Sequence, residues 1–226
     1  MNKIKVLCIS ASPRGAESES EKMLTQLMLW IKKYGGEAEL LRLAEKNILQ
    51  CEGCYSKTRH GEKCTYPCIH EGKDDTAEVL KEIVNADALA IATPIYWGSG
   101  SALIQRLIEK LTAVENNSDK FAGGKDPLEG KPFLLMCSQE SEGASLALSQ
   151  ISWALNHLGM VSLPWHIFKQ KILNRRIVRM GMRLIGERKF EWIDNTIRLG
   201  ARNLVNVSKL LKGYEFDDKD WAEPRC

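Results

Sequence analysis

The alternation of short apolar runs with longer amphipathic segments is the feature that most constrains the fold of this chain. The apolar runs have the length of β-strands, and the segments between them repeat apolar residues with helical spacing. We predict strands at about 4–10, 37–43, 87–93, 132–138 and 160–168. Helices are predicted at about 20–34, 75–86, 99–115, 144–158, 170–185 and 188–212. This order predicts an α/β fold, a doubly wound parallel sheet with helices on both faces.

Length and composition narrow the class of protein. A chain of 226 residues with 44% hydrophobic residues can bury one sizeable core, so we expect a single domain over 1–226. The formal net charge of +3 is too small to indicate a nucleic-acid partner. The sequence shows no signal-peptide pattern and no apolar run of about 18 or more residues. We therefore expect a cytoplasmic protein without an integral membrane segment.

Residues 10–22, between the first strand and the first helix, have the composition of an anion site. Helix N-terminal N–H groups carry partial positive charge, and an arginine can bind a phosphate through two hydrogen bonds. The absence of the G-x-G-x-x-G and G-x-x-x-x-G-K patterns predicts a single phosphate rather than a dinucleotide. The alternative is that Ser18 or Ser20 serves only as the helix N-cap. The candidate phosphate ligands are Ser10, Ser12, Arg14, Ser18 and Ser20.

Residues 93–101 follow the third predicted strand at its carboxyl end, where open α/β sheets bind their ligands. Pro94 fixes one backbone dihedral, two glycines allow a sharp turn, and Tyr96 and Trp97 offer flat apolar faces. A planar cofactor with hydrogen-bonding groups fits such a loop. The alternative is a strand-to-helix turn whose aromatic side chains pack into the core.

These two loops resemble those of the NADPH-dependent FMN reductase and iron-sulfur flavoprotein group of flavodoxin-like proteins. Residues 137–143, after the fourth strand, are similar as well. The resemblance implies a flavodoxin-like five-stranded parallel sheet in the order 2-1-3-4-5. It also implies that the FMN phosphate binds at residues 10–22, the serine-rich loop. The isoalloxazine ring would then be lined by Pro94, Ile95, Tyr96, Trp97, Gly98, Ser99, Ser138, Gln139 and Gly143.

The loop at 51–68 is rich in cysteine, and its four thiols are Cys51, Cys54, Cys64 and Cys68. In iron-sulfur flavoproteins the corresponding loop holds a [4Fe-4S] cluster, although here Lys57 stands at the position of that group's third cysteine. The spacing also suits zinc, with His60 or His70 as substitute ligands. A third alternative is a loop without metal. Because this loop leaves the second strand at its carboxyl end, we expect it at the same sheet edge as the other loops.

The remaining cysteines and charges have simpler interpretations. Seven cysteines, an odd number, favour thiols or metal ligands over a disulfide framework, and Cys8 and Cys137 are expected in the core. An additional C-terminal helical segment at about 169–187 is strongly basic. One interpretation is a helix that packs on the domain or on a second subunit. The alternatives are contact with a membrane surface or with an acidic electron-transfer partner. Charges on the helix at 99–115 are expected in solvent, namely Arg106, Glu109 and Lys110.

Together these features predict an oxidoreductase that binds FMN noncovalently. Electrons would pass through the flavin from NAD(P)H or a protein donor to a small-molecule or protein acceptor, and no side chain need act as nucleophile or general base. One alternative is an iron-sulfur flavoprotein that carries single electrons through the cysteine loop. Another is a metal-binding regulatory module that has lost the flavin. We expect a homo-oligomer, either a dimer or a tetramer.

Overall fold

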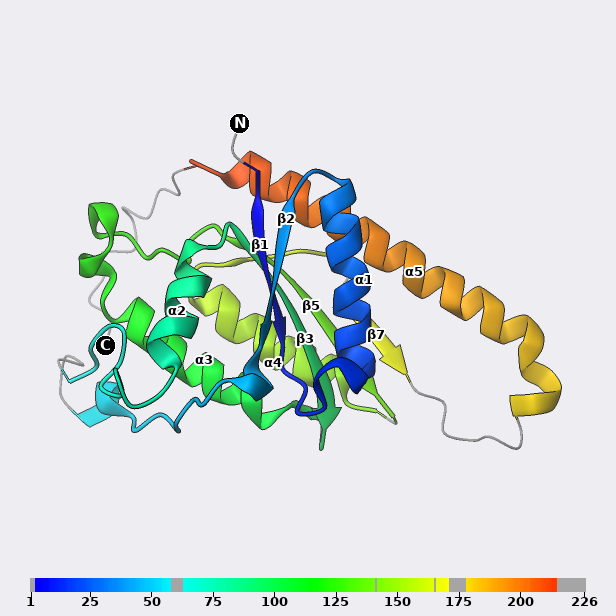
Figure 1. Cartoon of the computed structure of the whole chain (residues 1–226), viewed down its shortest axis with the longest axis horizontal. Helices are drawn as coiled ribbons and strands as arrows, with labels where there is room; N and C mark the ends of the chain where they lie inside the picture. The colour runs from blue at the N-terminus through cyan, green and yellow to red at the C-terminus, as the bar shows by residue number, and fades with distance from the viewer. Residues whose placement is uncertain (1–2, 58–62, 141, 165, 171–177, 215–226) are drawn as a thin grey trace.

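A computed structural model describes residues 3–57, 63–140, 142–164, 166–170 and 178–214, with the backbone alone for 168–170 and 178–191. A central twisted sheet lies between two layers of helices (Figure 1). Within these ranges no helix is both long and apolar enough to span a membrane.

The sheet confirms the predicted flavodoxin-like order. Its parallel strands lie in the order β2-β1-β3-β5-β6, which is 2-1-3-4-5 when these five strands are counted along the chain. The central strands are β1 (Lys5–Ser10), β2 (Glu37–Arg42), β3 (Ala88–Tyr96) and β5 (Pro132–Gln139). A short strand outside this count, β4 (Ser99–Gly100), pairs antiparallel with the end of β3.

The predicted fifth strand is split into two short strands along β5. These are β6 (Val161–Ser162) and β7 (Ile167–Gln170), and both pair parallel with β5. Pro164 lies between them, and proline has no N–H group to donate to a neighbouring strand. The interruption therefore follows from the sequence.

Helices cover both faces of the sheet, as predicted. One face packs against α1 (Glu19–Lys33) and the C-terminal half of α5 (Val178–Leu211). The other face packs against α2 (Thr76–Asn85), α3 (Ala102–Glu115) and α4 (Ala144–His157). Cys8 and Cys137 are fully buried in these two cores, and burial raises the pKa of each thiol to about 12.

The C-terminal region differs from prediction in one respect. The two helices expected at 170–185 and 188–212 are wrong, because the backbone from Val178 to Leu211 is one continuous helix. Its second half buries Ile193, Ile197, Ala201 and Leu204, which recur on one helix face, against the sheet. Residues 171–177 and the side chains of 168–191 lie outside the description, and with them most of the predicted basic segment.

Candidate functional site

Loops that follow β1, β3 and β5 meet at the carboxyl edge of the sheet. The Ala11 N–H donates to Ala92 O at 2.8 Å, and the Ser101 hydroxyl donates to Ala11 O, so the first two loops are joined. The third approaches at Gly143, where an added Cβ would lie 2.7 Å from the Cα of Gly98. All three predicted flavin-binding loops are thus neighbours, although they come from distant parts of the sequence.

The serine-rich loop begins α1 with Ser18 as its N-cap. The Ser18 hydroxyl accepts a hydrogen bond from the Glu21 N–H at 3.1 Å, and the Ser20 hydroxyl lies 3.4 Å from that of Ser18. The Ser12 hydroxyl accepts from the Arg14 N–H at 3.2 Å. All three serines are buried, whereas Arg14 is exposed. The predicted phosphate ligands Ser12, Arg14, Ser18 and Ser20 therefore belong to one local structure.

A buried carboxylate beside this loop was not predicted from the sequence. Glu21 is 1% exposed, and its carboxylate accepts hydrogen bonds from the Ser10 hydroxyl at 2.6 Å and from Arg42 Nε at 2.8 Å. The Ser10 hydroxyl, a predicted phosphate ligand, is thus bound to the protein itself. Ser18-x-x-Glu21 is the pattern of a helix capping box. That pattern predicts that the Glu21 side chain caps the start of the helix, but in the structure its carboxylate binds Arg42 and Ser10 instead.

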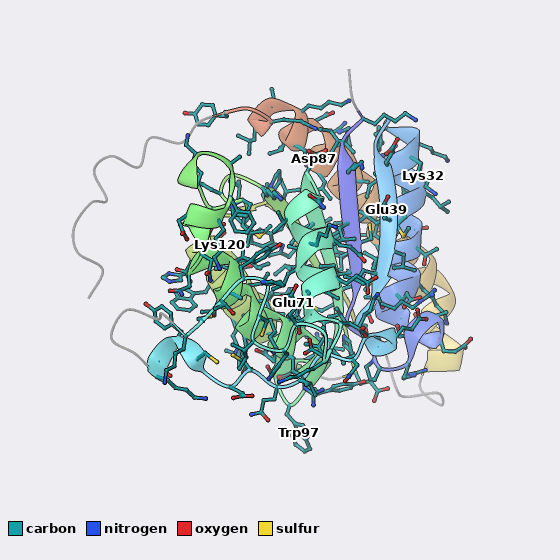
Figure 2. All side chains as sticks on the ribbon, turned by 60° about the vertical axis from the view of Figure 1, so that its left-hand side comes forward. Lys32, Glu39, Glu71, Asp87, Trp97 and Lys120 are labelled. Atoms are coloured by element: carbon teal, nitrogen blue, oxygen red, sulfur yellow. The ribbon has the colours of Figure 1, made fainter. Side chains whose placement is uncertain are left out.

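The aromatic loop is a tight hairpin rather than a plain strand-to-helix turn. The predicted strand end near residue 93 is wrong, since β3 continues to Tyr96 and then pairs with β4. Trp97 and Gly98 form the two-residue turn, with φ values of 53° and 75°. Figure 2 shows Trp97 projecting from the edge of the molecule, where its side chain is fully exposed. The alternative in which the aromatic side chains pack into the core is therefore wrong for Trp97.

The third loop supports the hairpin from the neighbouring strand. Pro94 of β3 pairs with Ser138 of β5, and the Gln139 side-chain carbonyl accepts a hydrogen bond from the Ala144 N–H at 2.8 Å. Gly143 has a φ of 106°, a conformation that favours glycine. Ser138 therefore lies beside Pro94, and Gly143 lies beside Ile95.

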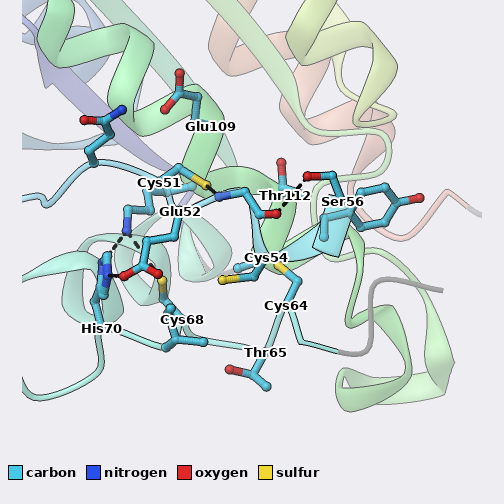
Figure 3. A pocket seen from close by; sticks show the side chains of 16 residues that line it. Cys51, Glu52, Cys54, Ser56, Cys64, Thr65, Cys68, His70, Glu109 and Thr112 are labelled. Carbon is cyan, nitrogen blue, oxygen red and sulfur yellow. Dashed lines mark hydrogen bonds and ion pairs between the residues drawn. The ribbon is translucent and has the colours of Figure 1, made fainter. Parts of the chain in front are cut away.

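The four cysteines of the second loop line one cavity of about 390 Å³. Figure 3 shows their side chains around this cavity, which is closed on one side by α3. The pKa of the Cys64 thiol is raised to about 11, first by burial and then by electrostatic repulsion from the other three cysteines. Cys68 shares the cavity with the other three thiols. In the described part of the chain, no group of three or more Cys, His, Asp or Glu side chains is arranged to hold a single metal ion.

A buried charged network lies behind this cavity, and it corrects the expectation that Lys110 is solvated. Lys110 is 2% exposed, and its Nζ lies 2.8 Å from His70 Nδ1, 3.5 Å from Cys68 Sγ and 3.9 Å from Asp74 Oδ2. His70 Nε2 lies 2.9 Å from a carboxylate oxygen of Glu52. This cluster comes from α3 and both ends of the cysteine loop, so no local sequence pattern reveals it.

Two further contacts hold the cysteine loop in place. Asp74 accepts hydrogen bonds from the Leu49 N–H at 2.9 Å and from the Thr76 N–H at 3.0 Å, which closes the base of the loop. Burial raises the pKa of Asp74, but these bonds and the charge of Lys110 outweigh it, so the pKa is lowered overall. At the far end, the Asn117 side chain donates to Cys64 O at 2.9 Å.

Comparison with known proteins identifies the family to which this geometry belongs. The sequence profile of the NADPH-dependent FMN reductases matches residues 4–170. The chain belongs to the NADPH-dependent FMN reductase family. It is a flavin-dependent oxidoreductase that works with FMN, and the three loops at the sheet edge are the part of this reductase that the family resemblance assigns to the flavin.

Relatives among characterised proteins are also flavoproteins. The reductase is 31% identical over 213 residues to an iron-sulfur flavoprotein of Archaeoglobus fulgidus, covering 92% of this chain and 98% of that protein. It is 34% identical over 107 residues to an iron-sulfur flavoprotein of Methanocaldococcus jannaschii, and there it spans about half of the relative's length, 51%.

Solved structures agree on the fold. RosB, solved with the bound intermediate 8-demethyl-8-formylriboflavin-5'-phosphate, has a TM-score of 0.74 at 23% identity, over 97% of this chain and 85% of RosB. An NAD(P)H:quinone oxidoreductase of Methanothermobacter marburgensis has a TM-score of 0.59 at 20% identity, over 90% of this chain and 98% of that chain.

Proposed function

We propose that this reductase accepts electrons from NAD(P)H on FMN and passes them on through a [4Fe-4S] cluster held by the cysteine loop. The observation that carries the proposal is the convergence of four thiols, from residues 51 to 68, on one cavity. A proposal of a flavin-free regulatory module finds no support, because the family is one of FMN reductases.

The residues of the sheet edge suit FMN. Ser12, Ser18, Ser20 and Arg14 offer hydroxyl and guanidinium donors at the N-terminus of α1, where partial positive charge favours a phosphate. The backbone at 94–99 and the side chains of Tyr96 and Trp97 provide the surface for the ring, with Ser138, Gln139 and Gly143 opposite. Bound FMN supplies the redox chemistry, and these groups bind it and orient it.

The donor set of the cysteine cavity fits an iron-sulfur cluster better than a single zinc ion. Zinc needs four ligand atoms about 2.3 Å from one point, whereas each thiolate of a [4Fe-4S] cluster binds a different iron. The four thiols line one cavity of about 390 Å³, and in the described part of the chain no group of three or more ligands is arranged around a single ion. Cys68 takes the role of fourth ligand, in place of the cysteine that Lys57 replaces.

The test is to purify the full chain without oxygen, reconstitute it with iron and sulfide, and measure FMN, iron, sulfide and zinc. We expect flavin bands together with a broad absorbance that reductant bleaches. The Cys54→Ser variant should keep FMN and lose most of its iron, because Cys54 is a buried ligand. Cys226→Ser, which removes a cysteine outside the loop, is the matched control and should keep both.

Each failure has a distinct meaning. A parent protein with FMN but no iron would leave a plain flavin reductase. Equal iron in the parent and in Cys54→Ser would place the metal elsewhere.

Reduction of FMN by NADPH and by NADH, compared in the same sample, tests the electron donor. We further propose that the protein is a cytoplasmic homo-oligomer. Light scattering of the purified protein checks the oligomeric state.

A further inference from the structure

The buried lysine on α3 carries an inference about the cysteine site that rests on the proposed function. We propose that Lys110 donates an N–H···S hydrogen bond to Cys68 and thereby raises the reduction potential of the cluster that this cysteine would hold. The observed geometry is a lysine Nζ 3.5 Å from Cys68 Sγ on a side chain that is 2% exposed.

The hydrogen-bond chemistry of the network fixes the role of Lys110 as a donor. An ammonium group has three N–H donors and no acceptor, so the His70 Nδ1 atom, 2.8 Å away, must accept. The His70 proton then resides on Nε2, which donates to Glu52. A second Lys110 proton faces Cys68 Sγ, and the third side of the ammonium faces Asp74.

The surroundings hold the Lys110 side chain in place. The side chain of Asp74 is fully buried and forms an ion pair with Lys110 at 3.9 Å, and three hydrogen bonds from Leu49 and Thr76 fix its carboxylate. Lysine is rarely this buried in a soluble domain unless it has a partner. Lys110 is therefore a buried residue with fixed partners, rather than a surface lysine that happens to lie near sulfur.

Electrostatics gives the direction of the effect. One electron from the reduced flavin, which NAD(P)H has reduced, adds one negative charge to the cluster and its thiolates, and no proton or bond changes at Cys68. A fixed positive charge in a poorly solvated cavity stabilises the form with more negative charge. Hydrogen bonds to the sulfur ligands act in the same direction. Lys110 therefore favours the reduced cluster and makes it a better acceptor for the flavin's electrons.

The test is a potentiometric titration of the reconstituted full chain, followed by the electron paramagnetic resonance signal of the reduced cluster. Lys110→Met keeps an unbranched side chain, one atom shorter, and removes both the donor and the charge. We expect its one-electron reduction constant to fall at least tenfold, which corresponds to about 59 mV. Lys110→Arg should stay within threefold of the parent, and Lys110→Gln, a neutral donor, should fall between Met and Arg.

Lys81→Met is the matched control, since it removes an exposed lysine of α2 and changes the net charge equally. Its potential should equal that of the parent. A Lys110→Met reduction constant within twofold of the parent's, with iron content unchanged, overturns the inference and leaves the cluster intact. Absence of iron in the parent overturns both proposals. If the Met variant binds no iron, the Gln variant decides. A reduction constant below those of the parent and of Lys110→Arg supports the inference, whereas a parent-like constant in both variants overturns the role of the charge and leaves a hydrogen-bond effect alone.

Discussion

The loops at the sheet edge and the cysteine loop hold their polar groups in different ways. At the edge, backbone pairing of β1, β3 and β5 fixes the loops, for example through Pro94 opposite Ser138. The described residues of the cysteine loop, 51–57 and 63–68, have little regular structure, and side-chain contacts with α3 and with Asp74 hold the loop. It leaves β2 at the same edge, as predicted, but its cavity lies against Lys110, about 12 Å along α3 from Ala102.

Because of this difference, we expect the two regions to respond to different perturbations. A parallel sheet positions its carboxyl-end loops wherever the strand order is right, so single side chains there matter for binding more than for shape. The cysteine loop depends on buried charged groups, so the loss of one partner affects its shape. The two sites should therefore be separable by single substitutions.

The largest separable effect is expected for Arg14→Ala at the sheet edge. Loss of a hydrogen bond to a charged group should weaken FMN binding by about 1.5–3 kcal/mol, roughly 10- to 150-fold. Fluorescence titration of the apoprotein with FMN measures this. Iron content should remain at the parent level, with Lys22→Ala on the exposed side of α1 as the control. Parent-like FMN affinity would contradict the phosphate assignment.

A comparable effect on the other region is expected for Asp74→Asn. Removing the carboxylate that faces Lys110 should lower the free energy of unfolding by about 1–3 kcal/mol and reduce iron retention, with FMN affinity unchanged. The folded-state pKa of Asp74 lies below its ordinary value of 3.8. Its contribution is therefore complete above pH 3.8 and is lost as the pH falls through the folded-state pKa.

Urea titrations of the parent and of Asp74→Asn at several pH values measure this contribution. The difference between the two proteins should be constant near neutral pH and should shrink below pH 3.8. A difference that grows on acidification would show that another group is responsible.

A smaller effect is expected for Gly143→Ala, where the loops meet. The new Cβ would lie 2.7 Å from the backbone of Gly98, and the left-handed backbone costs a non-glycine residue about 1–2 kcal/mol. Thermal unfolding should therefore show lower stability, together with weaker FMN binding. Gly123→Ala also has a positive φ but has open space around it, so it separates backbone strain from the close approach.

The smallest effect on stability is expected for Trp97→Asn. Asparagine tolerates a positive φ better than tryptophan, and the indole is fully exposed, so stability should change by less than about 1 kcal/mol. Flavin emission should nevertheless rise, because we place the indole beside the isoalloxazine ring. Unchanged emission and unchanged FMN affinity would make the hairpin tip a structural turn only.

The sequence alone was sufficient for the order of the five parallel strands. Apolar periodicity depends on the backbone's own repeat, so it located the strands and helices and predicted that the loops after β1 and β3 share one edge. It could not decide that β3 extends to Tyr96, because pairing with β4 determines this, and it did not predict that α5 is continuous.

Contacts between distant segments could not be predicted from the sequence and are seen only in the tertiary structure. Glu21 reads as a capping residue and Lys110 as a solvated charge, since a local pattern reports which helix face a residue occupies but not what packs against it. The fold brings Arg42 to the first and Cys68 with Asp74 to the second. A buried charge is stable only beside its partners, and those partners lie more than 20 residues away in the sequence for both side chains.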